Sequence, residues 1–553
     1  MTSPAHRAVP QPTTLLRGGS VYNPAEPYAT ALLTVGDTVA WIGSEDGADL
    51  HADSADTVID LGGALVTPAF VDAHVHTTST GLALTGLDLS GAESGTGLLD
   101  LVAAYAAKLP ADAVVLGSGW DETRWADAIA PSSGELDRAA GGRAVYLSRV
   151  DVHSAAVSSA LVADVPEAAG ATGYRANGLV AREAHHLLRA AAFARITPSQ
   201  RAAAQRAALR RAAELGIGAV HECAGPQISG EEDFAALLEL AAEEPGPYVF
   251  GYWGELTDPA KALELGAVGA GGDLFIDGAL GSRTAALREP YTDAAETSDP
   301  ANGGVAYLEA DQLAGFLVGC AEAGVQPGFH VIGDHAMDLL TGGLEGAAEV
   351  IGEARVRALT VRAEHAEMAD AAAIAALARF GVVVSAQPGF DEAWGGGDGM
   401  YVRRLGPERA ERMNPFAAFG AAGVVLAFGS DSPVTPLGPW AAVRAAAFHH
   451  TPASRITVRA AFAAHTRGGW RALRPDAAGV PADEQGVLAP GAAATYAVWG
   501  AGELVVQTPD SRVAAWSTDE RAGVPGLPDL TPGEPLPACL RTVVRGATVY
   551  DAH

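Results

Sequence analysis

The stretch ALVTPAFVDAHVH, residues 64–76, decides the fold more than any other part of this 553-residue chain. Its apolar run ends in His74 and His76, and side chains two residues apart in a strand point to the same face. If the strand belongs to a closed barrel, that face can be the interior. Both imidazoles would then reach one metal ion from the carboxyl-terminal rim of the barrel.

Seven further segments with strand character follow, and Ala- and Leu-rich stretches of helical period lie between them. These segments are 216–222, 248–254, 273–278, 325–332, 359–365, 382–388 and 424–431. Eight alternating βα units predict an α/β fold of the (β/α)8, or TIM, barrel type. A doubly wound sheet is the main alternative, but eight units exceed its usual number of strands.

Both ends of the chain contain short strand-like runs separated by turn residues, unlike the helix-rich middle. We predict that 14–66 and 481–553 form one small β-sandwich; two separate β modules are the alternative. The barrel is expected over 67–480. Residues 77–197 do not fit the alternation and are interpreted as an inserted subdomain over the barrel mouth. The polar residues 1–13 are expected to be a disordered N-terminus.

Composition narrows the class of protein. A net charge of −30 argues against a nucleic-acid partner, because the protein would repel phosphates. The three cysteines are far apart and odd in number, which fits a reducing compartment. Neither a signal peptide nor an apolar run of membrane-spanning length is found, so a cytoplasmic protein with no membrane partner is expected. A homodimer is one option for the oligomeric state.

Three more candidate ligands, His330, His365 and Asp431, come at the ends of expected strands. A single histidine at a strand end is more often a hydrogen-bonded polar residue than a ligand. Four histidines and an aspartate at the ends of the first, fifth, sixth and eighth strands form a set that suits zinc and similar metals. Because the eighth strand neighbours the first in a closed barrel, Asp431 is expected to face the histidine pair.

The sequence gives little support to other hydrolytic or nucleotide chemistries. It has no Gly-x-Ser-x-Gly motif of a serine hydrolase. Its only lysines, Lys108 and Lys261, are not followed by Ser or Thr, which excludes a P-loop. No Gly-x-Gly-x-x-Gly lies at a strand-to-helix turn, as a dinucleotide site would require.

Several phrases together resemble the amidohydrolase superfamily, and in particular its YtcJ-like, amidohydrolase 3 branch. They are VTPAFVDAHVH (66–76), GSGWDETRW (117–125), DVHSAAVSSAL (151–161), DGALGSRTAAL (277–287), HVIGDHAMD (330–338), RAEH (362–365), FGSDSPV (428–434) and GVLAPGAAATYAV (486–498). The resemblance implies a metal-bearing barrel and a β-sandwich built from both termini. It also implies that Asp431 binds metal and shuttles protons, beside the metal ligands His74, His76, His330 and His365.

One position departs from the family pattern, which usually carries a lysine at the start of the fourth strand. Carboxylation of that lysine makes it a bridge between two metal ions. Here the position is Asp273, and neither Lys108 nor Lys261 falls on an expected barrel strand. Three readings stay open: Asp273 bridges two metals, the site holds one metal, or Asp273 has no metal role.

Other residues in the matched phrases are candidates for contact with substrate. His153 lies in the insertion and would stabilise a developing oxyanion. Arg283 follows the fourth strand, where the catalytic loops of such barrels lie. The roles of Trp120, Asp121 and Asp151, all in the insertion, stay open.

Together these residues predict a metal-dependent hydrolase with one or two divalent ions, expected to be zinc, per chain. It would cleave the C–N bond of a small amide, formamide or cyclic amide with metal-activated water, and not a peptide bond. Asp431 would accept a proton from that water and return it to the leaving nitrogen. A deaminase or isomerase with the same site is the nearer alternative. A non-catalytic binding barrel is the more distant one, and the complete ligand set argues against it.

Overall fold

The computed structural model describes residues 11–122, 125–126, 129–149, 154–226, 228–293, 301–477, 479–507, 516–517 and 523–552. The chain forms two compact units. One is Thr77–Ala208, and the other combines Met1–His76 with Leu209–His553. The smaller unit begins at the first residue of the expected insertion and ends at Ala208 rather than at residue 197. Its placement over the barrel mouth stays a prediction.

Eight parallel strands form the barrel of the larger unit, in the order β19-β18-β17-β16-β15-β14-β13-β7. They are β7 (Phe70–Val75), β13 (Ile217–Ala224), β14 (Tyr248–Trp253), β15 (Gly269–Ala270), β16 (Gln326–Val331), β17 (Arg362–His365), β18 (Val383–Ala386) and β19 (Val425–Phe428). Nearly all their residues are buried, as expected for parallel strands covered on both faces. The TIM barrel expected from the sequence is therefore confirmed.

The first and last strands meet at their carboxyl-terminal ends. Val75 forms a parallel bridge with Ser432, and the Asp431 amide donates to the His74 carbonyl over 2.8 Å. The His76 amide likewise donates to the Ser432 carbonyl over 3.0 Å. These contacts bring the His74-Val75-His76 motif and Asp431 to one place on the rim.

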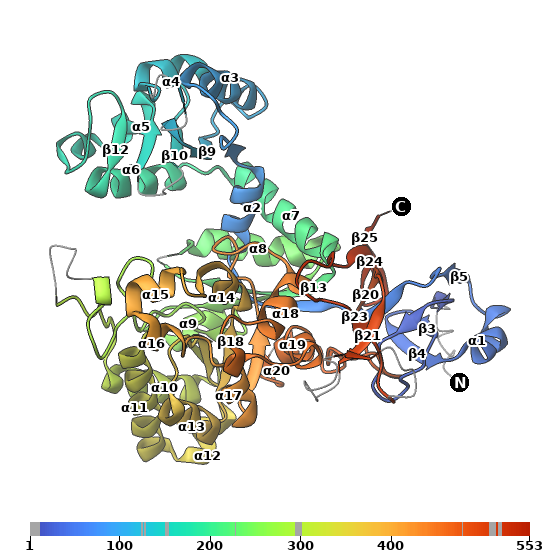
Figure 1. The fold of residues 1–553 in the computed structure, drawn as a ribbon. Coiled ribbons are helices and arrows are strands. Elements are labelled where there is room, and N and C mark those ends of the chain that lie inside the picture. Colours follow the sequence, from blue (N-terminus) through green and yellow to red (C-terminus); the bar gives the residue numbers. More distant parts are fainter. Residues whose placement is uncertain are drawn as a thin grey trace, which may run out of the picture. The chain divides into compact units, whose positions relative to one another are not determined.

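Helices surround the strands, with α10, α11 and α13 on the outside of the barrel in Figure 1. The helices of this layer and of the rim loops are α8 (Glu231–Glu243), α9 (Pro259–Glu264), α10 (Ala310–Ala323), α11 (Asp334–Ile351), α12 (Glu353–Ala358), α13 (Ala371–Phe380), α14 (Pro388–Trp394), α15 (Met400–Leu405), α16 (Pro407–Ala410), α17 (Phe416–Ala421), α18 (Pro439–Ala447), α19 (Val458–Ala464) and α20 (Arg467–Ala472). Helix α7 (Pro198–Glu214) spans the boundary between the two units.

The fourth strand corrects the sequence prediction. The sequence predicts it at 273–278, where the structure has an isolated parallel bridge between Phe275 and His330, whereas the strand β15 itself covers Gly269–Ala270. The strand ends there because Gly271 and Gly272 have φ of +134° and +75°. A Cβ on Gly271 would lie 2.1 Å from the Gly328 carbonyl oxygen. Asp273 therefore follows the strand instead of starting it, which puts its carboxylate at the carboxyl-terminal rim.

Strands from both ends of the chain share one sheet, in the order β2-β6-β20-β24-β25. Its members are β2 (Ser20–Val21), β6 (Leu65–Pro68), β20 (Tyr496–Gly500), β24 (Ala538–Val544) and β25 (Ala547–Asp551). A second sheet, β4-β3-β1-β5, consists of β4 (Thr38–Gly43), β3 (Ala31–Val35), β1 (Thr13–Arg17) and β5 (Thr57–Asp60). Leu16 and Leu32 of the second sheet share an apolar core with Val66 and Val498 of the first. The N-terminal segment also contains a helix that the sequence reading missed, α1 (Glu45–Ala52).

Trp499 of β20 connects this sheet to the barrel. Its indole is 1% exposed, donates to Thr67 Oγ1 over 2.9 Å and packs edge-on against Phe70 and Trp440. We expect Trp499→Ala to lower the free energy of unfolding by roughly 3–5 kcal/mol, the usual result of emptying a large buried aromatic site. Urea unfolding followed by circular dichroism measures this. A loss below about 1 kcal/mol would show that the sheet is only loosely joined to the barrel.

The smaller unit has its own sheet, in the order β12-β11-β10-β9-β8. Its elements are α2 (Thr77–Thr85), β8 (Leu87–Asp88), α3 (Gly95–Ala106), β9 (Val115–Trp120), α4 (Ser133–Ala139), β10 (Val145–Arg149), β11 (Ser154–Val157), α5 (Ser159–Asp164), β12 (Leu179–Ala181) and α6 (Arg182–Ala194). Two apolar clusters pack within this unit, one around Leu98 and Trp120 and the other around Leu161 and Leu188.

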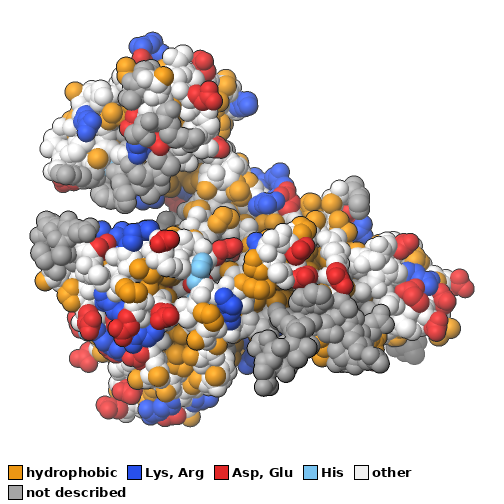
Figure 2. Space-filling model, in the orientation of Figure 1, with side chains coloured by type: hydrophobic (Ala, Val, Ile, Leu, Met, Phe, Trp, Pro, Cys, Tyr) orange, Lys and Arg blue, Asp and Glu red, His pale blue; other side chains and the backbone are white. Residues whose placement is uncertain are grey.

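On the face drawn in Figure 2, acidic side chains occur in several places and mix with basic ones near α10–α13. Among the described residues, no helix is both long and apolar enough to cross a membrane.

Candidate metal centre

Four histidines and two aspartates converge at the carboxyl-terminal end of the barrel. They come from five strand segments, and five of the six are at most 6% exposed. They are His74 and His76 at the end of β7, Asp273 after β15, His330 in β16, His365 at the end of β17, and Asp431 after β19. His76 is the sixth, with its side chain 14% exposed.

The Asp273 carboxylate lies between two pairs of histidines. Its Oδ2 is 3.4 Å from His74 Nε2 and 3.2 Å from His76 Nε2. Its Oδ1 is 3.5 Å from both His330 Nδ1 and His365 Nε2. Ligand atoms about 2.0–2.1 Å from a tetrahedral zinc ion are separated by about 3.3 Å. The observed spacings match that separation.

Asp431 lies beside the first pair of histidines, His74 and His76. Its Oδ1 is 3.1 Å from His76 Nε2 and 3.5 Å from His74 Nε2. His74, His365 and Asp431 also place one ligand atom each within 4.8 Å of one another. The cluster therefore offers ligand atoms on both sides of Asp273, with Asp431 on the side of His74 and His76.

Each histidine has one nitrogen held by the protein and the other directed into the cluster. The anchoring partners are Glu364 Oε2 for His74 Nδ1 (2.9 Å), the Cys223 carbonyl for His76 Nδ1 (2.9 Å), Gln387 Oε1 for His365 Nδ1 (2.8 Å) and the Gly278 carbonyl for His330 Nε2 (3.1 Å). An acceptor on one nitrogen fixes the tautomer and leaves a lone pair on the other. All four rings are thus oriented to donate a lone pair to the cluster.

Several atoms inside the cluster are buried without a hydrogen-bond partner in the described part of the chain. They are His74 Nε2, His330 Nδ1, His365 Nε2, Asp273 Oδ1 and Asp431 Oδ1. Buried polar atoms normally have partners, because burial without one costs free energy. Unpaired atoms at ligand spacing fit divalent metal ions, and the donor set of imidazoles and carboxylates is the one zinc and similar metals take.

The backbone conformation at two of the candidate ligands directs their side chains into the site. His365 and Asp431 have φ of +69° and +54°, which is uncommon for residues other than glycine. Along β17, Arg362 and Glu364 share one face, so regular alternation would point His365 to the other. The positive φ at the strand end redirects it toward the cluster. Such strained residues gather at functional sites.

Burial and the surrounding histidines shift the pKa of both aspartates in opposite directions. Burial raises the pKa of Asp273, but His74 and the other histidines around it outweigh that and hold the pKa well below its usual value. The same opposition, with His74 and His76, lowers the pKa of Asp431. Both carboxylates are therefore in the charged form that coordinates metal.

A buried ion pair beneath the cluster was not found from the sequence. Arg362 and Glu364 are both fully buried, with Arg362 Nε 2.7 Å from Glu364 Oε1. Arg362 also donates to the Ala73 carbonyl and Ser385 Oγ. Glu364 in turn accepts the hydrogen bond from His74 Nδ1, so the pair sets the orientation of a candidate ligand. In the sequence, the signal for this ion pair was the two-residue spacing of Arg362 and Glu364 in RAEH.

We expect Glu364→Gln to weaken zinc binding about 10- to 100-fold, the usual effect of losing a group that orients a ligand. The free energy of unfolding should also fall by about 3–5 kcal/mol, because Arg362 loses its buried counter-ion. Competition with a chelator and urea unfolding measure the two effects. The exposed Glu349→Gln on α11 is the matched control. Unchanged zinc affinity in Glu364→Gln would mean that His74 needs no such support.

Of the other candidates, Arg283 is engaged away from the ligand atoms of the cluster. His153 and Asp151 lie outside the described residues. Arg283 forms a two-point ion pair with Asp293, over 3.0 and 2.8 Å. Within the smaller unit, the Trp120 indole donates to a backbone carbonyl in the apolar core, and Asp121 pairs with Arg149. Holding local structure is the role these contacts favour for Arg283, Trp120 and Asp121.

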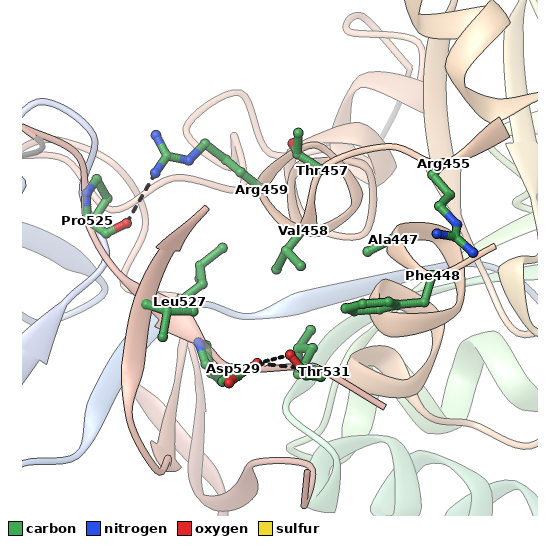
Figure 3. A pocket seen from close by; sticks show the side chains of 13 residues that line it. Ala447, Phe448, Arg455, Thr457, Val458, Arg459, Pro525, Leu527, Asp529 and Thr531 are labelled. Atoms are coloured by element: carbon green, nitrogen blue, oxygen red, sulfur yellow. Dashed lines mark hydrogen bonds between the residues drawn. The ribbon is translucent and has the colours of Figure 1, made fainter. Parts of the chain in front are cut away.

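A cavity of about 550 Å³ opens on the metal cluster, with His76, Asp273, His330, His365 and Asp431 among its lining residues. A second cavity of similar size, about 560 Å³, lies between α18, α19 and the segment around Leu527. Figure 3 shows Phe448, Val458 and Leu527 around it, with Arg455 and Arg459 at opposite ends. It contains no residue of the cluster, so the first cavity is the candidate active site.

An eight-stranded parallel barrel with histidines and aspartates at its carboxyl-terminal rim is the arrangement expected of a metal-dependent hydrolase. The model of the Amidohydrolase family matches residues 57–550, so the chain belongs to that family. It is 26% identical to the putative amidohydrolase YtcJ of Bacillus subtilis over 70% of this chain and 74% of that protein. It is 23% identical to the N-substituted formamide deformylase of Arthrobacter pascens, over 75% and 80% respectively.

A solved structure agrees with this assignment. An uncharacterized metal-dependent hydrolase from Pyrococcus furiosus superposes with a TM-score of 0.71 and 26% sequence identity. The match covers 88% of this chain and 98% of that one.

Proposed function

We propose that this protein hydrolyses the C–N bond of a small amide, formamide or cyclic amide, with Asp431 as the residue that moves the proton. The observation that carries the proposal is the convergence of His74, His76, His330 and His365 on Asp273, with Asp431 at 3.1 Å from His76 Nε2. A site built only for structure would not leave so many buried ligand atoms unpaired.

The cluster would hold two divalent ions. His74, His76 and Asp431 would bind one, His330 and His365 the other, and Asp273 would contribute one carboxylate oxygen to each. Such ions, when bound, polarise a carbonyl group and make water a nucleophile near neutral pH. Asp273 thereby takes the place that the family's carboxylated lysine usually has.

The chain's own residues supply orientation and proton transfer. Asp431 is charged and lies at the edge of the cavity, where it accepts a proton from the attacking water and returns it to the leaving nitrogen. Its strained backbone and the hydrogen bond from its amide to the His74 carbonyl fix its direction. The name of the Arthrobacter relative, a deformylase of N-substituted formamides, supports C–N hydrolysis as the reaction.

An activity screen tests this proposal. Zinc-loaded protein is assayed against formamides, cyclic amides, carbamates and amino-purines, with chelator-treated protein as the control. We expect amine release from at least one amide class and its loss on chelation. Release of ammonia from amino-purines alone would make the protein a deaminase. Turnover that survives complete removal of metal would contradict the proposal.

A further inference from the structure

The cavity above the candidate metal cluster has mainly apolar walls. Away from the candidate ligands, most of its lining side chains are apolar or aromatic, and they come from the loops after five different strands. Representative members are Ile228, Phe275, Leu280, Ile332, Phe390 and Val434. A pocket of about 550 Å³ with these walls fits a drug-sized or smaller apolar group.

Aromatic rings form a continuous row from a candidate ligand into the cavity. Phe390 stacks on His365 with ring centroids 5.9 Å apart and an interplanar angle of 12°. Trp394 follows at 4.7 Å from Phe390, and Tyr401 lies 6.3 Å beyond Trp394. These rings all come from α14 and α15, so the rim after β18 forms this wall.

Glu367 places a carboxyl group in this apolar wall, and it is not a candidate ligand. It is 3% exposed, and its Oε2 accepts the Tyr401 hydroxyl over 2.5 Å. Asn414 Nδ2 donates to the same hydroxyl, and the Asn414 amide donates to the Glu367 carbonyl. These contacts hold the side chain in place. The other oxygen, Oε1, forms no hydrogen bond with any residue that the structure describes, and Glu367 lines the cavity.

The charged side chains that line the cavity bear on which substrate groups its wall can pair with. The carboxyl groups that face the cavity are Asp273, Asp431 and Glu367, while its cation, Arg403, is exposed and donates to the Asp398 carbonyl. Among the described residues that line the cavity, a substrate carboxylate beside Glu367 would find no buried lysine or arginine to pair with. A neutral group with a hydrogen-bond donor would instead pair with Oε1 and avoid leaving it unpaired.

We propose that this cavity selects neutral secondary amides with an aromatic or branched apolar substituent, and that Glu367 Oε1 accepts the hydrogen bond of the amide N–H. This inference rests on the proposed function for its reaction, and it adds the substrate class. Trp394 and Phe390 provide the surface for the substituent, and Glu367 is a binding residue that determines specificity.

A substrate pair tests the role of Glu367. N-Benzylformamide has the N–H donor, and N-benzyl-N-methylformamide lacks it. Wild-type protein should prefer the first by at least about a hundredfold in kcat/KM, since a site built for a donor rejects the analogue without it. Glu367→Leu should lose most of this preference, and Glu367→Gln, which keeps an acceptor oxygen, should retain part of it. The exposed Glu392→Gln on α14 is the control and should behave as wild type. An equal preference in wild type and Glu367→Leu, at unchanged zinc content, would overturn the assignment.

Binding measured without turnover separates this inference from the proposed function. The probes are benzamide, acetamide and the charged analogue hippurate. Their binding is measured by the change in tryptophan fluorescence of the zinc-loaded protein. Benzamide should bind at least about tenfold more tightly than either other probe, and Trp394→Leu should remove that advantage. Tighter binding of hippurate would overturn the inference even if amides are hydrolysed. If no amide is hydrolysed but benzamide is preferred, the reaction is wrong and the character of the cavity stands.

Discussion

Asp431→Asn should nearly abolish turnover while leaving the fold and most of the bound metal in place. Asparagine keeps the shape of the side chain and one oxygen, but it cannot accept a proton near neutral pH. Loss of a general acid–base group typically lowers the rate by about a hundred- to ten-thousand-fold. The loss should fall mainly on kcat, because proton transfer belongs to the transition state more than to substrate binding.

The competing view treats Asp431 only as a metal ligand, since its Oδ1 lies 3.1 Å from His76 Nε2. On that view saturating zinc would restore the Asp431→Asn variant. Steady-state kinetics over a zinc titration therefore distinguishes the two roles, with Asp100→Asn, an exposed carboxylate of the smaller unit, as the control. A return to near wild-type kcat under excess zinc would leave only the ligand role.

Asp273→Asn should reduce bound zinc from about two ions per chain to one or fewer and lower kcat/KM by about a hundredfold or more. The reason is geometric: Oδ2 faces His74 and His76, and Oδ1 faces His330 and His365. An amide places an NH2 group on one of these sides, and that group cannot coordinate a cation. Losing the charge stabilisation of one metal costs several kcal/mol at the transition state, hence the size of the effect.

Elemental analysis and kinetics of the same preparation measure both parts of this result. Wild-type metal content together with wild-type activity in Asp273→Asn would make the aspartate a bystander. Loss of one metal with full activity would mean that a single ion is enough for catalysis, and the two-metal assignment would then be wrong for the reaction.

The barrel and its candidate ligands could be predicted because both leave a periodic signal in the sequence. Buried parallel strands read as apolar runs, and ligands at the barrel rim come at the ends of those runs, as His330 and Asp431 do. The expected order of strands also put Asp431 beside the pair at the end of β7. The bridge contacts between Val75 and Ser432 agree with that expectation.

Other parts of the site left no such signal. The fourth strand was misplaced because two glycines end β15 early, and only their backbone angles show why Asp273 reaches the rim. Glu367 and Tyr401 are 34 residues apart and meet only through the loops after β17 and β18. The role of Arg362 is not visible in the sequence, because its burial depends on partners from other strands of the barrel.

Anomalous diffraction from crystals of the zinc-loaded protein, recorded at the zinc absorption edge, tests the central claim most directly. The claim is that this rim cluster holds two divalent ions that share Asp273. It predicts two peaks about 3.5–4 Å apart, one beside His74 and His76 and the other beside His330 and His365. No peak at the cluster, or a single peak that does not touch Asp273, would contradict it.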